Sequence, residues 1–410
     1  MGKIFFCASS KYLSMDSSDS SEDFYAQRRK RAKIPQAKPC PFMDTVNRYL
    51  LDFDFEKVCS STLASSNVYA CLVCGKFFQG RGRGTPAFIH SMEQDHHVFL
   101  NLVDEKAYCL PDNYAIAEDS LKDIRFNLNP KFDAESLQTN FPNTALSLTG
   151  AEYVPGIVGL NLIREDSYLN ASIQALAVVG PLRDFFLTFQ PTPTCDKLTA
   201  SFSRLLKRMF NPRSFKGVVS PQEFLQAVST HSNKQFCAMA NDPMAFLDWL
   251  LPIVDGCLGR DRGPVFQGKL NGAPFHSLHL QLPPVPVFRG QEADEFLSSV
   301  PLVDLLPKSF EPSQFLTLQI SRFVKNEFFL EKNPTIVRFP IKGLDVGNDK
   351  FDLVAQICHE GDRPDSGKFI AYVVHPQTGQ WFECNGLRIV KVLPQSVALV
   401  ESYVQIWKRR

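Results

Sequence analysis

Four residues that can bind a metal ion constrain this 410-residue chain most strongly. Cys71 and Cys74 are separated by two residues, and His90 and His96 follow with five residues between them. Thiolate and imidazole are ligands that Zn²⁺ prefers, and these spacings are close to those of a closed tetrahedral site. The pattern therefore predicts one structural zinc ion, because four protein ligands leave no position at which a water could be activated.

The other cysteines leave one question open. The chain has eleven cysteines, an odd number that crowds toward residues 40 to 109, which favours metal ligation in a reducing compartment over a disulfide framework. Two interpretations stay open for four further residues in this region. They are buried thiols and a packed ring, or they are ligands of a second metal ion: Cys40, Cys59, Cys109 and His97.

The first 38 residues are rich in serine and then in basic side chains. Residues 17–23 are serines and acids, and residues 28–33 contain five lysines and arginines. Such a segment buries too little apolar surface to offset its chain entropy, so we predict that residues 1–38 are disordered. The basic run is typical of a nuclear-import signal, a short RNA-contacting patch or a solvated charged tail, and the first of these predicts a nuclear protein.

Charge and hydropathy exclude two broad classes. The 44 lysines and arginines nearly cancel the 43 aspartates and glutamates, so no global positive field attracts nucleic acid and any RNA contact would be local. No stretch approaches 18 uncharged apolar residues, so the sequence predicts no membrane span. The first residues also lack a signal-peptide pattern, and we expect an intracellular protein.

Hydrophobic periodicity predicts the secondary structure. In the first part, Pro86 is expected to start a helix that carries His90, and residues 98–102 a buried strand. Later, apolar residues recur at helical spacing and then alternate as in half-buried strands. The predicted helices are 181–189, 197–210, 220–230 and 243–252, and the predicted strands include 265–270, 276–282 and 315–323. Helices followed by strands predict an α+β domain.

Residues 159–176 resemble the cysteine box that opens the catalytic domain of ubiquitin-specific proteases. The positions that agree with that box are Gly159, Leu160, Tyr168, Asn170, Gln174 and Leu176. Ser167 stands where this family has its nucleophilic cysteine, and Glu165 stands where it has the asparagine that helps to hold the oxyanion. The resemblance implies a papain-like thumb, palm and fingers architecture for this part of the chain.

The C-terminal part resembles the histidine box of the same family. Gly367, Phe369, Ala371, Tyr372 and Trp381 agree with it. Lys368 occupies the position of the general base, and Asn385 keeps the position of the residue that orients the base.

Together these substitutions predict a protease-like domain without turnover. A lysine with an ordinary pKa of about 10.4 is neutral in only about one molecule in two thousand at pH 7, so Lys368 is a poor base for Ser167. A carboxylate at Glu165 about 4 Å from a developing oxyanion would cost about 4 kcal/mol at an effective dielectric of about 20. His359 is a substitute base only if it is neither packed in the core nor facing solvent.

The region around the metal ligands resembles the zinc finger of ubiquitin-specific proteases, and the resemblance implies Cys71, Cys74, His90 and His96 as the ligands of one zinc ion. Some members bind the free carboxyl tail of ubiquitin near this knuckle, but residues 76–81 depart from their pattern, so we do not expect ubiquitin binding. The implied organisation is a tail over 1–38, a zinc finger over 39–143, a linker over 144–155 and a degenerate protease-like domain over 156–410.

One branch of the family resembles this chain from about residue 40 to its last residue: the catalytically degenerate zinc-finger proteins of the spliceosome. Segments 50–57, 69–76, 78–82 and 108–114 carry that resemblance. It implies a nuclear, non-catalytic scaffold in pre-mRNA splicing that associates with the proteins of the U4/U6.U5 tri-snRNP, with direct RNA contact left open. The alternatives are an active deubiquitinase that uses Ser167 and a ubiquitin-binding adaptor outside the spliceosome.

Overall fold

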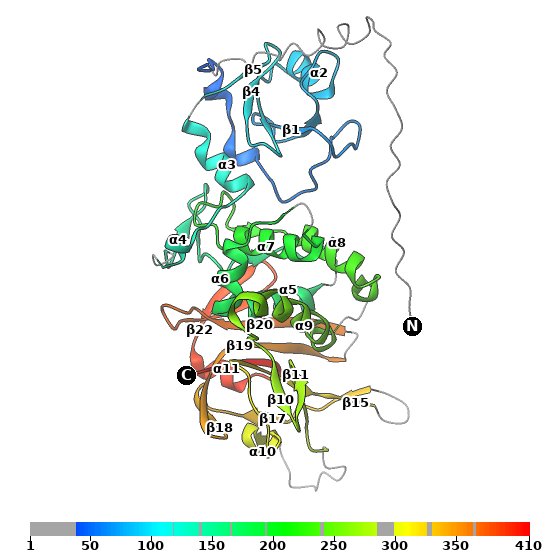
Figure 1. Cartoon of the computed structure of the whole chain (residues 1–410), viewed down its shortest axis with the longest axis vertical. Helices are drawn as coiled ribbons and strands as arrows, with labels where there is room; N and C mark the ends of the chain where they lie inside the picture. Colours follow the sequence, from blue (N-terminus) through cyan, green and yellow to red (C-terminus); the bar gives the residue numbers. More distant parts are fainter. Residues whose placement is uncertain are drawn as a thin grey trace, which may run out of the picture.

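The computed structural model of the chain describes residues 38–117, 119–138, 142–164, 166–192, 195–237, 242–284, 299–325, 330–363 and 366–410. Apart from Lys38, the tail predicted to be disordered lies outside the described residues. The described chain forms two parts along the long axis of the molecule, a small N-terminal part and a larger body (Figure 1).

The N-terminal part is a five-stranded antiparallel sheet with a helix against it. Its strands lie in the order β2-β1-β3-β4-β5, and helix α2 (Pro86–Glu93) begins at Pro86, whose missing amide hydrogen costs nothing in the first turn. The strands are β1 (Val68–Cys71), β2 (Phe77–Gln79), β3 (Val98–Asn101), β4 (Ala107–Cys109) and β5 (Tyr114–Ala115). The expected helix at Pro86 and the expected strand at 98–102 are confirmed.

Short elements surround this sheet and lead away from it. They are the 3-10 turns η1 (Met43–Thr45), η2 (Arg48–Leu50) and η3 (Asp119–Leu121), followed by α3 (Lys122–Leu128) and α4 (Ala134–Gln138). Leu121, Ile124 and Leu128 pack on one core with the apolar residues of β1, β3 and β4, so α3 belongs to the N-terminal part.

The body begins with helices. They are α5 (Ser167–Ala177), α6 (Gly180–Thr188), α7 (Lys197–Met209), α8 (Gln222–His231) and α9 (Pro243–Arg262), with the 3-10 turn η4 (Gln235–Cys237) before α9. Asp196 accepts a hydrogen bond from the amide of Thr199 and so caps α7. The four helices predicted from periodicity are confirmed.

An eight-stranded sheet forms the rest of the body. Seven strands lie in the order β12-β14-β23-β19-β20-β21-β22, and β18 pairs with β19 beside this path. The strands are β12 (Leu278–Gln281), β14 (Phe315–Ser321), β18 (Lys342–Val346), β19 (Asp349–Arg363), β20 (Ser366–Val374), β21 (Trp381–Asn385), β22 (Arg388–Val392) and β23 (Ser402–Arg409).

Small pairs complete the body. They are β6 (Ala145–Leu146) with β7 (Glu152–Tyr153), β8 (Gly159–Leu160) with β9 (Val218–Val219), β10 (Gly268–Leu270) with β11 (Ala273–Phe275), β13 (Ser299–Pro301) with β17 (Ile336–Arg338), and β15 (Phe323–Lys325) with β16 (Leu330–Lys332). Two short helices, α10 (Leu302–Leu305) and α11 (Pro394–Leu399), lie on the body as well.

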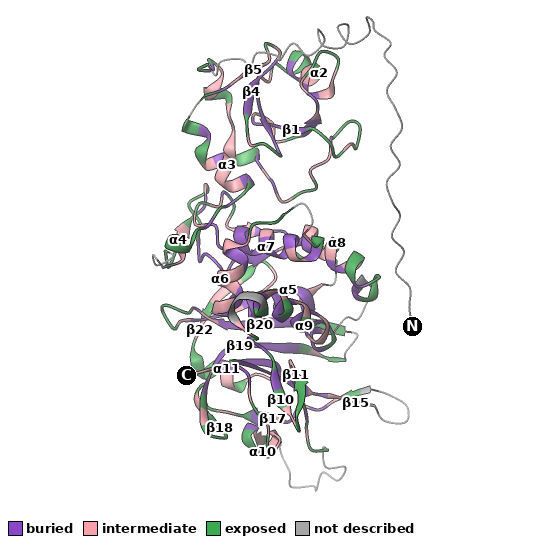
Figure 2. Ribbon diagram, in the orientation of Figure 1, coloured by how far each residue is buried: buried purple, intermediate pink, exposed green. Residues whose placement is uncertain are grey.

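The two faces of the large sheet have separate cores. Ile357 and Ala371 belong to the core built with helices α5 to α9, whereas Cys358 and Ile370, their neighbours along β19 and β20, belong to the core on the opposite face. This alternation follows from the two-residue period of a strand and gives β19 and β20 their nearly continuous burial (Figure 2). The predicted α+β class is therefore confirmed.

Two expected elements differ from the structure. Helix α9 continues past residue 252 to Arg262, because Leu250, Val254 and Leu258 all enter the same core and outweigh the hydrogen bond that Pro252 removes. The strand expected at 265–270 is formed only at Gly268–Leu270, because the carboxylate of buried Asp255 accepts the amide hydrogens of residues 265 to 267.

The two parts meet at a junction rich in polar contacts. The guanidinium of Arg208 on α7 donates to the carbonyl of Phe53 at 3.1 Å and lies 3.4 Å from the carboxylate of Asp54. Asn127, at the end of α3, accepts from Asn211 at 3.1 Å. The segment expected to be a linker contains the hairpin β6–β7. Within the described residues, no helix combines the length and the apolar character needed to cross a membrane.

Candidate functional site

The four predicted metal ligands converge in the N-terminal part. The ligand atoms of Cys71, Cys74, His90 and His96 all lie within 4.8 Å of one another. Each sulfur has a ring nitrogen nearby, at 3.6 Å for Cys71 with His96 Nδ1 and 3.4 Å for Cys74 with His90 Nε2, and the two nitrogens are 3.0 Å apart. A tetrahedral zinc ion would place sulfur and nitrogen about 3.5 Å apart and two nitrogens about 3.3 Å apart. The cluster therefore fits zinc.

Local structure explains why these residues meet. Cys71 ends β1, and the turn that follows brings Cys74 back under it through a hydrogen bond from the Gly75 amide to the Cys71 carbonyl. Gly75 has a φ of 77°, and a Cβ there would lie 2.1 Å from the carbonyl oxygen of Leu50, so only glycine fits. Helix α2 carries His90, whose ring stacks on Phe78 with centroids 4.1 Å apart.

The electrostatics of the cysteine pair suit a metal ligand. A hydrogen bond from the Cys71 thiol lowers the pKa of Cys74 to about 4. One thiolate is therefore available at neutral pH before any cation arrives.

The residues considered for a second metal site have other partners. His97 Nδ1 lies 2.7 Å from the carbonyl of Leu110, and Nε2 lies 2.8 Å from the carboxylate of Asp95. Cys109 contacts both Cys40 and Tyr114, and burial raises its pKa to about 11. Among the described residues, these thiols and His97 do not form a further ligand cluster with Cys59.

Arg81 lies beside the zinc cluster, in the run that departs from the ubiquitin-binding pattern. Its guanidinium lies 4.2 Å from the ring centroid of Tyr108 and donates to the side-chain oxygen of Asn113. Arg81 is thus engaged within the finger.

Ser167 lies at the first position of α5, the helix that the cysteine-box resemblance placed in the catalytic centre. Asp166 holds the cap position before it and makes no side-chain cap bond. The Oγ of Ser167 accepts a hydrogen bond of 3.1 Å from the backbone amide of Phe369 on β20. The structure therefore brings the two predicted boxes together, 202 residues apart in sequence.

Two other residues of the cysteine box hold its entry strand in place. The side-chain amide of Asn170 donates to the carbonyl of Asn161 at 3.2 Å, and that of Gln174 donates to Val158 at 2.6 Å. Both side chains are buried, and the bond from Gln174 satisfies a carbonyl that is itself buried. Their role in this chain is structural.

Lys368, at the position of the general base, is engaged elsewhere. Its Nζ lies 2.9 Å from the carboxylate of Glu360, the residue directly opposite on β19. Strand alternation places Lys368 on the face of β20 that carries Ile370, whereas Phe369 belongs to the core around α5. The ammonium is thus paired with a carboxylate and directed away from the helix that carries Ser167.

The remaining positions of the protease pattern add no base. Asn385 ends β21, half-buried and in register with Arg388 of β22. Glu165, predicted to oppose an oxyanion, lies outside the described residues.

His359 is packed in the sheet, which is one of the two arrangements in which it does not act as a base. It is directly opposite Phe369, its ring is 3% exposed, and it packs against Phe369 and Phe323 with centroids 4.9 and 5.3 Å away. Burial and the nearby ammonium of Lys332 lower its pKa, and its Nδ1 has no hydrogen-bond partner among the described residues. His359 is therefore a packed, neutral ring.

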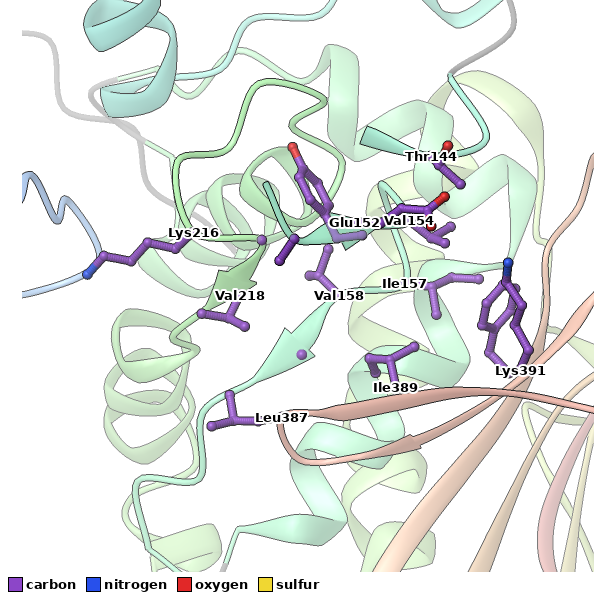
Figure 3. Close-up of a pocket in the computed structure, with 15 residues that line it drawn as sticks. Thr144, Glu152, Val154, Ile157, Val158, Lys216, Val218, Leu387, Ile389 and Lys391 are labelled. Carbon is purple, nitrogen blue, oxygen red and sulfur yellow. The ribbon is translucent and has the colours of Figure 1, made fainter. Parts of the chain in front are cut away.

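A separate cavity of about 280 Å³ lies between the β6–β7 hairpin and the edge strand β22. Val158, Val218, Leu387 and Ile389 give it an apolar floor, and Lys391 lies at its rim (Figure 3). Ser167, Lys368 and Asn385 do not line it, so this cavity is not a remnant of the protease site.

Fold and site together define a zinc finger joined to a ubiquitin-specific-protease-like domain. The family profile described as "Ubiquitin carboxyl-terminal hydrolase" matches residues 158–407, and that described as "Zn-finger in ubiquitin-hydrolases and other protein" matches residues 57–121. The chain belongs to the ubiquitin carboxyl-terminal hydrolase family.

Three comparisons place it within that family. "Ubiquitin carboxyl-terminal hydrolase 39" of Mus musculus is 37% identical over 477 residues, which cover 95% of this chain and 84% of the relative. "Probable mRNA-splicing protein ubp10" of Schizosaccharomyces pombe is 32% identical over 443 residues, which cover 90% of this chain and 88% of the relative. A solved structure titled "Crystal structure of an essential yeast splicing factor" matches with a TM-score of 0.81, at 28% identity, over 90% of this chain and 99% of that chain.

Sequence reasoning found the residues of both sites but missed several of their partners. The Phe369 amide bound by Ser167 is a backbone group, which leaves no trace in a sequence. Counting back from the paired ends of β19 and β20 does not predict Glu360 as the partner of Lys368, because the register of the two strands shifts between Glu360 and Arg363.

Proposed function

We propose that this chain is a non-catalytic scaffold in pre-mRNA splicing that associates with the U4/U6.U5 tri-snRNP and stabilises it through protein–protein contacts. The names of the similar proteins give two directions: the Mus musculus relative is named a hydrolase, and the Schizosaccharomyces pombe relative an mRNA-splicing protein. Both cover at least 90% of this chain, so the names alone do not decide between catalysis and assembly.

The ion pair between Lys368 and Glu360 is the observation that carries the proposal. Hydrolysis by Ser167 requires a group that takes its proton, and the side chain at the position of the base is a lysine paired with a carboxylate. An ammonium group that is paired with a carboxylate has no lone pair with which to accept a proton. Ser167 moreover accepts a hydrogen bond from the Phe369 amide, an interaction that does nothing to deprotonate it.

The proposed site residues follow from this. Ser167, Lys368 and Asn385 are degenerate triad positions without a catalytic role, and Glu165 occupies the oxyanion position. Cys71, Cys74, His90 and His96 hold one structural zinc ion, which would supply part of the folding free energy of the finger. The proposed limits are 1–38 for the tail, 39–143 for the zinc finger, 144–155 for the linker and 156–410 for the protease-like domain, in a protein of the nucleus.

Affinity purification of the tagged full chain from nuclear extract tests the proposal. We expect the U4, U5 and U6 small nuclear RNAs and tri-snRNP proteins to co-purify, and equally with a Ser167→Ala variant, because binding does not use the hydroxyl. Co-purification of ubiquitin conjugates without these RNAs would instead favour the adaptor outside the spliceosome.

A further inference from the structure

A cavity of about 280 Å³ lies where the zinc finger meets helix α7. Its walls come from both parts of the molecule: the loop before β1, the turn between β3 and β4 and residues 128–131 on one side, and α7 with residues 190–191 on the other. Figure 1 shows α3 and α7 on the two sides of this junction. The charged side chains that line the cavity are Lys57, Glu105, Lys131, Arg204, Lys207 and Arg208. Five cations thus surround one carboxylate.

Glu105, the carboxylate in the lining, is already neutralised. Its two oxygens accept hydrogen bonds from Lys131 at 3.1 Å and from the side-chain amide of Asn129 at 2.9 Å. Glu105 is therefore paired directly with Lys131, and its charge acts on Lys57 only at longer range.

The two arginines of α7 have carboxylate partners behind the cavity wall. Arg204 lies 2.5 Å from Glu223 on α8, and Arg208 lies 3.4 Å from Asp54 and 4.0 Å from Glu223. Two carboxylates thus balance two guanidiniums. The Nε of Arg204 is nevertheless buried without a hydrogen-bond partner, so one donor in the wall remains unused.

Among the described residues, Lys57 and Lys207 are the two cations of the lining that have no direct carboxylate partner. The ammonium of Lys207, a residue 4% exposed, donates to the neutral carbonyl of Phe189 at 2.6 Å. Burial and the charge of Arg208 lower the pKa of Lys57 to about 8, and burial with the charge of Arg204 lowers that of Lys207. Within the described residues, neither ammonium forms an ion pair with a carboxylate.

We infer that this cavity binds a phosphate dianion, as free phosphate or as the phosphate group of a phosphomonoester. Two ammonium groups without a direct carboxylate partner match the charge of about −2 that such a group carries near pH 7, and the free Nε of Arg204 supplies a further charge-assisted hydrogen bond. A phosphodiester of an RNA backbone carries only one negative charge, so it balances the pair less well. Because Lys57 belongs to the finger and Lys207 to α7, the dianion would also tie the two parts together.

Titration of inorganic phosphate into the zinc-loaded full chain, followed by calorimetry at constant ionic strength, tests this inference. We expect Lys57→Gln to weaken binding about tenfold or more, and Lys57→Arg, which keeps the charge, to retain most of the affinity. Lys216→Gln is the matched control, because Lys216 lies at the same junction but pairs with Asp52 and does not line the cavity. If Lys57→Gln binds less zinc or unfolds early, Lys207→Gln replaces it with the same expected loss.

Two results would overturn the inference. One is phosphate affinity that is absent, or equal in the native chain and in the Lys57→Gln and Lys207→Gln variants. The other comes from a ten-nucleotide RNA with hydroxyl groups at both ends: if its binding depends on Lys57 and free phosphate does not compete, the ligand is a phosphodiester. Neither result bears on splicing association, because the inference does not rest on the proposed function.

Discussion

The metal cluster and the protease-like site are both built from residues that are distant in sequence. Only in the metal cluster do the side chains come together around one point. In the cluster, the end of β1, the turn after it, helix α2 and the loop before β3 bring four ligand atoms within 4.8 Å. In the protease-like body, α5 and β20 still meet, but Ser167 accepts from a backbone amide and Lys368 faces Glu360. The fold therefore keeps the positions of a protease site together, while the side chains at two of them contact other groups.

The two regions also differ in what their polar groups stabilise. Asn170 and Gln174, both at positions of the protease pattern, use their side-chain amides to hold backbone carbonyls. These hydrogen bonds stabilise the fold of the body, as metal ligation would stabilise the fold of the finger. The predictions below test this contrast, beginning with the largest expected effect.

Removal of the metal should abolish the structure of the finger and spare the body. Cys74→Ser, or a strong chelator, removes a ligand set whose zinc affinity accounts for about 10–16 kcal/mol in small zinc domains. We expect loss of zinc by elemental analysis and loss of hydrogen-exchange protection confined to residues 57–121. Cys195→Ser, a cysteine outside the cluster, is the control and should keep its zinc. Hydrogen-exchange protection that survives in the metal-free finger would show that the finger does not depend on its metal for its fold.

Removing an ion pair at the junction of the two parts should lower the free energy of unfolding by less than removing the metal does. Arg208→Met leaves the partly buried carboxylate of Asp54 without its cation, at a cost of about 3 kcal/mol in the free energy of unfolding. Lys216→Met removes a more exposed partner of Asp52 and should cost less than about 1 kcal/mol. Urea denaturation of both variants measures the difference, and equal losses would show that burial at the junction is unimportant.

Acid should destabilise the body through its buried histidine. Burial lowers the folded-state pKa of His359, so below the unfolded value of about 6.5 the unfolded chain binds a proton that the folded chain does not. The contribution of His359 to stability is therefore full above about pH 6.5 and falls as the pH drops through that value, by at most about 1.4 kcal/mol per pH unit. His359→Phe should flatten this slope in unfolding measured between pH 7 and 5. A slope unchanged by the substitution would mean that the ring is not kept neutral by the fold.

The sequence predicts the metal cluster fully and the body only in part. Cys71, Cys74, His90 and His96 were identified from spacing, because a turn and a helix fix short-range geometry. The orientation of Lys368 was not, since it depends on which face of a long strand meets α5, and for His359 the sequence left packing in the core and exposure to solvent open. The junction contact between Arg208 and Asp54 joins residues 154 positions apart and has no local signature in sequence.

Hydrolysis of a fluorogenic ubiquitin C-terminal conjugate by the folded, zinc-loaded full chain tests the central claim most directly. Because Lys368 is paired with Glu360 and His359 is packed in the core, we expect no release above the buffer rate, and no difference between the native chain and the Ser167→Ala variant. Release that the native chain catalyses and Ser167→Ala abolishes would contradict the claim and assign the chain an active hydrolase site.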